Sequence, residues 1–338
     1  MKFASLFTGI GGFDLGLERA GHEVVFQCES LAYRQGVLAR HWPGVPFSND
    51  IVGTSIPQVE MICGGFPCQD ISVAGRQEGI HGENSSLFFE LARIADESIQ
   101  DGGWVLLENV SNLLASNDGR DFIVVIRTLA ELGFHDLAWR VFNSESFGVP
   151  QRRRRVFILA RRASGDSARQ VLLEPESSAR NHRAVGEEGA LAAAAARSAT
   201  QETGRLVTQS LTTRFGNTGI DLRDAEANFI VSFDTRQLPL TPRTGTAPTL
   251  TTKDGVSVSD GDMLRRLTPT ECERLQGFPD GWTIQNGPSL RYAPSWYQLD
   301  ELDPEPMDPK PDGPRYAAVG DAVTVPVAEW IGNRLNRL

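Results

Sequence analysis

The architecture of this chain follows most directly from one segment, KFASLFTGIGGFDLGLERAG at residues 2–21. It begins with a short apolar run, continues through a glycine-rich turn, and ends in an amphipathic pattern that Gly21 closes. An apolar run that ends in glycines is typical of a buried parallel strand, and the pattern after it is typical of a helix. We therefore expect a strand, a tight turn and a helix in succession.

The same alternation of strand and helix continues as far as residue 162. Further strands are expected at HEVVFQCES (22–30), VEMICGGF (59–66), GWVLLENV (103–110) and RVFILARR (155–162), with a helix at LFFELARIADESI (87–99). This order predicts the α/β class, with a Rossmann-like, doubly wound and mostly parallel sheet. Ligands bind such sheets at the carboxyl ends of the strands, so the residues there are the candidates for function.

Composition narrows the class of protein without deciding its partner. The 338 residues are 40% hydrophobic and 22% charged, as in a globular protein. No apolar run approaches the ~20 residues of a membrane helix, and the first residues lack the apolar core of a signal peptide, so we expect a cytoplasmic protein without a membrane partner. The net charge of −10 is uneven, because four arginines are consecutive at 152–155, so it does not exclude nucleic acid.

Three features together indicate a ligand that contains adenosine. The turn FTGIGG at 7–12 would let a ligand approach the backbone next to a helix N-terminus. Glu29 ends the next strand, where an acidic residue typically binds ribose hydroxyls, and Asp50 ends an expected third strand. Taken singly, the turn is as readily a simple strand–helix connection, and each acid is more often a solvated strand-end residue.

The segment GGFPCQDIS at 64–72 supplies a candidate nucleophile. Cys68 follows a strand and a turn in which Pro67 restricts the backbone. A thiol at the end of a strand in an α/β sheet is accessible and can be activated as a nucleophile. The other cysteines, Cys28, Cys63 and Cys272, are interpreted as buried structural thiols, and no cysteine or histidine spacing predicts a metal site.

Two further motifs carry an acid and a basic run. LENV at 107–110 places Glu108 at the end of another strand, where a carboxylic acid could protonate or hydrogen-bond a ring nitrogen. QRRRRVF at 151–157 places Gln151, Arg153 and Arg155 on one face if the segment is extended. Arginines suit phosphates and base edges, although a solvated basic run is the plain alternative.

In this order, FTGIGG, GGFPCQ, LENV, QRRRR, RLTPTECERLQGFPD and YAAVGDAVTVPVAEWIG resemble the DNA cytosine-5 methyltransferase family of bacterial and phage type. The resemblance covers residues 1–162, 264–282 and 316–338, a little over half of the chain. It implies an enzyme that transfers a methyl group from S-adenosylmethionine to carbon 5 of a flipped cytosine in duplex DNA, through a covalent Cys68 adduct. We also expect it to act as a monomer.

The resemblance assigns roles residue by residue. Cys68 would attack carbon 6 of cytosine, Glu108 would hold nitrogen 3, and Arg155 would contact the base. Arg153 would position Cys68 and its loop, and Asn109 would support the site. The residues expected to bind the cofactor are Phe7, Thr8, Gly9, Ile10, Gly11, Gly12, Glu29, Ser30, Asp50, Ile51, Pro67, Leu87, Asp321 and Ala322. Those expected to bind DNA are Gln69, Ser72, Arg76, Gln77, Arg214, Thr249 and Leu250.

The resemblance also implies a division of the chain into segments. We expect a catalytic S-adenosylmethionine-binding domain at 1–162, a smaller target-recognition domain at 163–282, an acidic Pro-rich insertion at 283–313, and a C-terminal segment at 314–338 that returns to the catalytic domain. The recognition domain is rich in Thr, Gly and Asp around residues 206–262, which favours short strands and loops.

Some residues depart from the family's pattern. Ser30 stands where an aromatic residue often follows the ribose-binding acid, and Gly320-Asp321 replaces the usual Gly-Asn. The acidic insertion also separates two motifs that often lie closer.

Three alternative functions share part of these sequence features. An RNA cytosine-5 methyltransferase of the tRNA-modifying branch would share the motifs, but the long variable region before RLTPTECERLQGFPD favours DNA. A non-catalytic DNA-binding relative would not need an intact Cys68 and Glu108. An NAD-dependent oxidoreductase explains the glycine turn and leaves Cys68 without a role.

Overall fold

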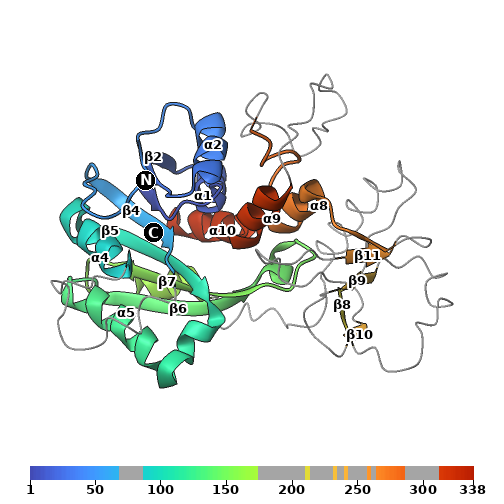
Figure 1. The fold of residues 1–338 in the computed structure, drawn as a ribbon. Helices are drawn as coiled ribbons and strands as arrows, with labels where there is room; N and C mark the ends of the chain where they lie inside the picture. Colours follow the sequence, from blue (N-terminus) through green and yellow to red (C-terminus); the bar gives the residue numbers. More distant parts are fainter. Residues whose placement is uncertain are drawn as a thin grey trace. The chain divides into compact units, whose positions relative to one another are not determined.

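The structure is a computed structural model that describes residues 1–67, 87–173, 267–285 and 312–338, together with five short strands between residues 210 and 266 (Figure 1). The chain divides into two compact units. The first consists of Met1–Phe142, Arg154–Arg180 and Val323–Leu338, and the second of Asn143–Arg153 and Asn181–Ala322. The segment boundaries expected from the sequence stay a prediction.

The first unit is built on a seven-stranded sheet with the order β3-β2-β1-β4-β5-β7-β6. Its strands are β1 (Lys2–Leu6), β2 (Glu23–Cys28), β3 (Phe47–Ser48), β4 (Val59–Gly65), β5 (Ile99–Val110), β6 (Asp136–Asn143) and β7 (Arg154–Arg161). The pairs β1–β2, β1–β4, β2–β3 and β4–β5 are parallel, and β7 runs antiparallel to β5. The mostly parallel sheet expected from the alternating pattern is therefore confirmed.

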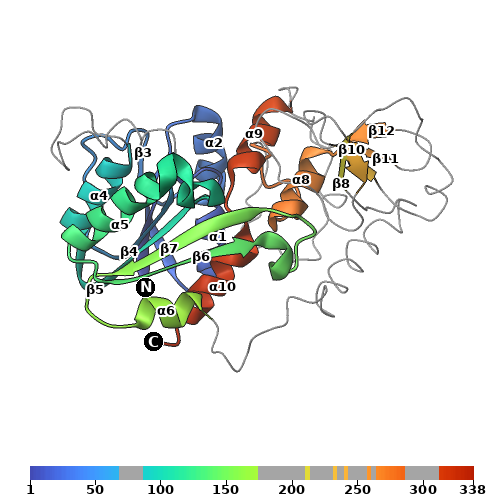
Figure 2. The ribbon, with the colours of Figure 1, turned by 90° about the horizontal axis from the view of Figure 1, so that it is seen from below.

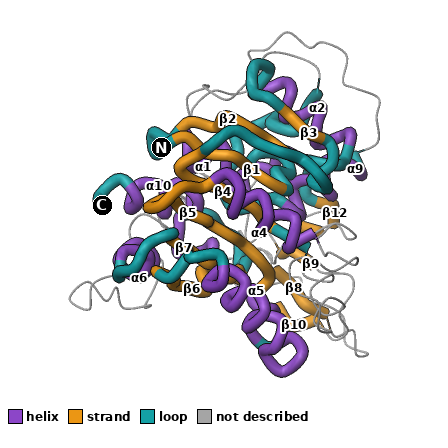
Figure 3. The backbone as a smooth tube through the Cα atoms, turned by 90° about the vertical axis from the view of Figure 1, so that its left-hand side faces the viewer, coloured by secondary structure: helices purple, strands orange, loops and turns teal. Residues whose placement is uncertain are grey.

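Helices cover both faces of this sheet (Figures 2 and 3). They are α1 (Gly12–Arg19), α2 (Ala32–His41), α4 (Leu87–Ser98), α5 (Arg120–Glu131), α6 (Ser167–Leu172) and α10 (Val325–Leu335). α4 and α5 pack on one face, where Phe88, Leu91 and Leu129 share a core with Leu107 and Ile158 of the strands. On the other face the ring of Phe13 from α1 meets Phe157 of β7 at 6.3 Å between centroids. Burial of both sheet faces explains why the strands are nearly continuous apolar runs.

The C-terminal helix α10 completes the first unit by packing against α1. The spacing of apolar residues predicts one helical face that carries Val323, Val327, Trp330, Ile331 and Leu335. In α10, Val327, Ile331 and Leu335 are buried and Trp330 is half-buried, while Val323 precedes the helix. Polar contacts anchor its far end, because the ring of His22 hydrogen-bonds to the carbonyl oxygen of Gly332 at 3.0 Å. The C-terminal helix therefore completes the helical layer that contains α1.

The second unit contains a five-stranded sheet with the order β10-β8-β9-β11-β12. Its strands are β8 (Ser210–Thr213), β9 (Val231–Phe233), β10 (Leu240–Pro242), β11 (Ser257–Ser259) and β12 (Leu264–Arg266), and its helices include α8 (Pro269–Gln276) and α9 (Gly313–Asp321). Helix α8 begins with a capping box formed by Thr268 and Glu271. The hydroxyl of Thr268 accepts from the backbone of Glu271, whose carboxylate accepts from the backbone of Thr268.

A buried ion pair joins α8 to α9 in the second unit. The carboxylate of Glu273 accepts a hydrogen bond from the backbone of Thr283 at 2.9 Å and pairs with Arg315 at 3.1 Å. Burial raises the pKa of Glu273, and the charge of Arg315 opposes that rise. Thr283 is fully buried, so the first residue of the expected insertion is part of this core.

No helix in the described ranges is long and apolar enough to cross a membrane. Within the same ranges, no group of three or more His, Cys, Asp or Glu side chains is arranged to hold a metal ion.

Candidate functional site

The glycine turn lies between β1 and α1 and has an unusual backbone. Phe7 takes a left-handed φ of 53°, and Gly9 and Gly11 take φ values of 62° and 84°. An added Cβ at Gly9 would meet no atom within 4 Å, whereas one at Gly12 would lie 2.3 Å from the carbonyl oxygen of Val323. One part of the turn is therefore packed against the C-terminal segment, and the part at Gly9 leaves space for a ligand.

The turn is fixed to the end of β2 by Glu29. Its carboxylate accepts hydrogen bonds from the backbone nitrogens of Gly9 at 2.8 Å and Leu31 at 2.9 Å, and the residue is 5% exposed. The hydroxyl of Thr8 donates to the carbonyl oxygens of Ser5 at 2.8 Å or of Cys28 at 3.0 Å. The glycine turn and the acid that the sequence predicts to act together do lie together.

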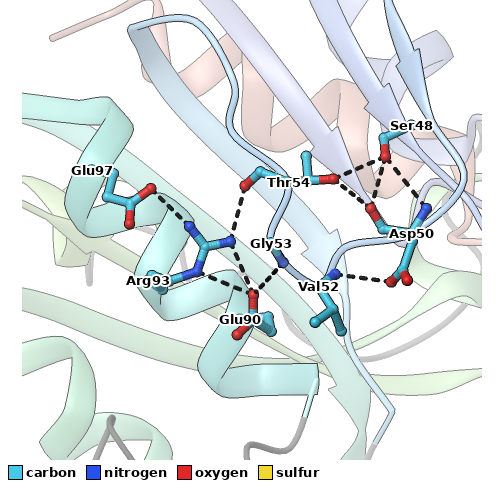
Figure 4. A network of polar contacts seen from close by, with 8 residues as sticks. All are labelled: Ser48, Asp50, Val52, Gly53, Thr54, Glu90, Arg93 and Glu97. Atoms are coloured by element: carbon cyan, nitrogen blue, oxygen red, sulfur yellow. Dashed lines mark hydrogen bonds and ion pairs between the residues drawn. The ribbon is translucent and has the colours of Figure 1, made fainter.

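A third loop at the same edge of the sheet carries Asp50 and follows β3. The side chain of Asp50 accepts from the backbone of Val52 at 2.9 Å (Figure 4). Two residues of α4 hold the loop: Glu90 accepts from the backbone of Gly53 at 3.2 Å, and Arg93 donates to the carbonyl oxygen of Thr54 at 2.9 Å.

Arg93 is itself held by two carboxylates of its own helix. It pairs with Glu90 at 2.9 Å and with Glu97 at 2.8 Å (Figure 4). In the loop that it holds, Ile51 is buried and Asp50 is exposed. The network thus connects α4 to the loop expected to meet the adenine, a connection that sequence reasoning missed because Glu90 and Arg93 have the spacing of an ordinary helix-surface pair.

Glu108 lies at the end of β5 and is 8% exposed. The Nε atom of Arg155 on β7 lies 3.0 Å from its Oε1 atom. An added Cβ at Gly65 would be 3.2 Å from Oε2, so the acid lies beside the chain that leads to Pro67 and Cys68. The side chain of Asn109 donates to the carbonyl oxygen of Phe66 at 2.9 Å and fixes that chain to β5.

The residues of the basic run, 151–157, do not all belong to one extended strand. Strand β7 begins at Arg154, so Gln151 and Arg153 precede it, and both are buried. In the second unit, Arg153 donates to the carbonyl oxygen of Gly320 at 2.9 Å and to that of Ala322 at 2.9 Å. Arg153 therefore fixes the turn that bears Asp321, while its expected action on Cys68 stays a prediction.

The remaining expected residues divide into two groups. Ser30, Pro67 and Asp321 are exposed, and Leu87 is half-buried at the start of α4. The others lie outside the described residues: Cys68, Gln69, Ser72, Arg76, Gln77, Arg214, Thr249 and Leu250.

Comparison with known proteins now assigns the family. A model of the C-5 cytosine-specific DNA methylase family matches residues 1–337. The chain belongs to this family. This confirms the DNA cytosine-5 methyltransferase activity expected from the motifs, and the oxidoreductase alternative is wrong.

Two bacterial Type II methyltransferases show the level of sequence identity between this DNA methylase and its relatives. The chain is 29% identical over 343 residues to M2.BsuMI of Bacillus subtilis, covering 100% of this chain and 76% of the relative. It is 29% identical over 308 residues to M.HhaI of Haemophilus parahaemolyticus, covering 86% and 88% of the two chains.

Solved structures share the fold of the DNA methylase. A prophage-encoded protein of E. coli, described as a DNA modification methyltransferase, superposes with a TM-score of 0.56 at 17% identity, covering 100% of this chain and 99% of the other. The Dnmt2 methyltransferase of S. pombe gives 0.55 at 14% identity, with the same coverage. At these identities the likeness establishes the methyltransferase fold and no more.

Proposed function

We propose that this chain transfers the methyl group of S-adenosylmethionine to carbon 5 of a cytosine that has left the DNA duplex, and that it acts as a monomer. Membership of the family establishes cytosine-5 methylation of DNA, and the proposal adds the donor, the flipped base and the residues. The position of Glu108 supports it most. Its carboxylate pairs with Arg155 and lies beside Gly65, shortly before Cys68 in the chain.

The glycine turn and Glu29 fit a cofactor that carries adenosine. Gly9 leaves space beside the turn, and the carboxylate of Glu29 is buried and fixed, with lone pairs left for ribose hydroxyls. Asp50 and Ile51 would meet the adenine. Further contacts are proposed for Phe7, Thr8, Ile10, Gly11, Gly12, Ser30, Pro67, Leu87, Asp321 and Ala322. When bound, S-adenosylmethionine supplies an electrophilic methyl group.

The chemistry must activate carbon 5 of cytosine, which is a weak nucleophile. The thiolate of Cys68 would add to carbon 6 while Glu108 holds nitrogen 3 and offsets the charge that develops on the ring. Carbon 5 then gains the methyl group and loses its proton, and the Cys68 thiolate leaves carbon 6. Because both faces of the ring must be reached, the base has to leave the stack.

Arg155 would act at the same place as Glu108. Its ion pair with the carboxylate orients both side chains, and we propose that it contacts the cytosine. We propose that Arg153 acts through the turn at Gly320 and Ala322, which it holds, as well as on the loop of Cys68. Duplex DNA would be bound by Gln69, Ser72, Arg76, Gln77, Arg214, Thr249 and Leu250.

DNA that contains 5-fluorocytosine tests the covalent step, because fluorine cannot leave carbon 5 as a proton does. With S-adenosylmethionine present, we expect the wild type to form a slow-migrating protein–DNA complex on a denaturing gel, and Cys68→Ser to form none. Cys272→Ser is the matched control, since that thiol is 1% exposed and burial raises its pKa.

Two results would contradict the proposal. One is a complex that persists in Cys68→Ser, and the other is a wild type that methylates DNA but traps no fluorinated base. Transfer of a labelled methyl group to tRNA in preference to duplex DNA would instead revive the RNA alternative.

A further inference from the structure

A buried polar cluster follows the glycine turn and takes no part in the chemistry proposed above. Asp14, in the first turn of α1, accepts a hydrogen bond from the Ser5 hydroxyl of β1 at 2.8 Å and from the Gln27 amide of β2 at 2.7 Å. Asp14 is 0% exposed, and Ser5 and Gln27 are each 1% exposed. A carboxylate in this setting holds three separate elements of the fold together.

Both partners of Asp14 lie next to the residues that form the cofactor site. The carbonyl oxygen of Ser5 is within 2.8 Å of the Thr8 hydroxyl in the glycine turn. Gln27 is followed by Cys28, whose carbonyl oxygen lies 3.0 Å from the same hydroxyl and whose backbone nitrogen donates to it at 3.1 Å. Asp14 therefore fixes β1 and β2 just before the point where Thr8 joins them.

The residue after Cys28 is Glu29, whose carboxylate holds the backbone nitrogen of Gly9 at 2.8 Å. We propose that Asp14 is a positioning residue for the cofactor: through Ser5 and Gln27 its carboxylate sets the spacing between the glycine turn and Glu29. This inference rests on the cofactor role proposed for the turn and for Glu29.

The charge on Asp14 changes near neutral pH. Burial raises its pKa from 3.8 to about 7, against the hydrogen bonds from Gln27 and Ser5, and Glu18 one turn along α1 adds to the rise. On β4, Cys63 interacts with the cluster, and its pKa is raised by burial and by the charge of Asp14. Because burial favours the neutral carboxyl, protonation does not destabilise the fold as the pH falls through about 7. It changes the hydrogen bonds instead: a protonated carboxyl has one good acceptor oxygen in place of two, so it should fix the positions of Ser5 and Gln27 less closely.

Asp14→Asn tests the inference, because the amide imitates the protonated carboxyl at every pH. Binding of S-adenosylmethionine is measured by calorimetry from pH about 6 to about 8.5, a range that spans the titration of the carboxyl. We expect the affinity of the wild type to fall as the pH falls, and Asp14→Asn to bind about three- to tenfold more weakly at the upper end, with a flatter profile. Ser5→Ala, which removes one donor, should give a smaller loss in the same direction.

Asp121→Asn is the matched control. Asp121 also lies in the first turn of a helix, α5, is 3% exposed, and accepts from the hydroxyl of Ser116 at 2.5 Å. It should keep the affinity and pH profile of the wild type.

The possible results distinguish a failure of this inference from a failure of the proposed cofactor role. A wild type that binds no S-adenosylmethionine at any pH would overturn the cofactor role itself. A wild type that binds, with Asp14→Asn and Ser5→Ala matching it at every pH, would overturn the inference alone. An equal loss in Asp121→Asn would also overturn it, because the effect would then be general destabilisation.

Discussion

At the scale of single residues, the carboxylate of Glu108 has two neighbours with different consequences. The Nε atom of Arg155 lies 3.0 Å from it, and an added Cβ at Gly65 would lie 3.2 Å from it, so the carboxylate is also close to the segment that leads to Cys68. We therefore expect Glu108 to contribute to the rate through its position as well as through its proton.

We expect Glu108→Gln to lower the single-turnover methylation rate by about 10²–10⁴-fold, the usual contribution of a positioned acid. DNA affinity should change little, because the ring contact is made after the base leaves the stack. The matched control is Glu145→Gln, since Glu145 also faces an arginine, Arg152, at 3.7 Å in the second unit. A Glu108→Gln rate equal to that of the wild type would move the acid role elsewhere.

At the scale of elements, α4 supports the Asp50 loop as well as the core. Its apolar face at Phe88 and Leu91 packs on the sheet, and its polar face presents Glu90 and Arg93 to the loop (Figure 4). Because Arg93 donates to the carbonyl oxygen of Thr54, the position of the loop depends on the helix.

Arg93→Met keeps the length of the side chain and removes its donors. We expect the affinity for S-adenosylmethionine to fall about three- to tenfold, with an unchanged turnover number at saturating cofactor. Arg162→Met is the control, because Arg162 binds Asp96 and the carbonyl oxygen of Ile99 at the other end of α4. Similar melting temperatures with different affinities would support the positioning role, and equal affinities would refute it.

At the scale of the whole molecule, catalysis and target choice should be carried by different parts of the chain. The motifs of the first unit are shared by enzymes with different targets, so they cannot encode the sequence that is read. We propose that this information lies in the recognition domain expected at residues 163–282, in its Thr-rich loops. Arg214, Thr249 and Leu250, the residues expected to read it, lie outside the described residues.

We expect Arg214→Ala and Thr249→Ala to relax or weaken target choice while cofactor binding stays unchanged. An arginine that contacts a base edge is worth about 1–3 kcal/mol of discrimination. One that contacts phosphate would lower affinity for all sequences and flatten the salt dependence. Methylation profiles across a random-site library distinguish these results, and profiles and rates equal to the wild type would place the recognition loops elsewhere.

Local patterns in the amino-acid sequence were enough to predict most strands of the first sheet and the glycine turn, whereas β6 was not among the expected strands. Each of these depends on neighbouring residues: an apolar run buried on two faces, or glycines that accept a left-handed backbone. The positions of Glu29 and Glu108 at one edge of the sheet could be predicted as well, because parallel strands have their carboxyl ends at the same edge.

Other features depended on how distant segments pack. The hydrogen bonds of Arg153 to the carbonyl oxygens of Gly320 and Ala322 join residues 167 and 169 positions apart in the chain, and the basic run around Arg153 does not indicate them. In the sequence, Asp14 has the position of an ordinary polar residue in an amphipathic helix. In the structure it accepts hydrogen bonds from Ser5 and Gln27. A side chain's burial and its hydrogen-bond partners are set by the segments that pack around it, and the residues next to it in the chain carry no signal of which segments those are.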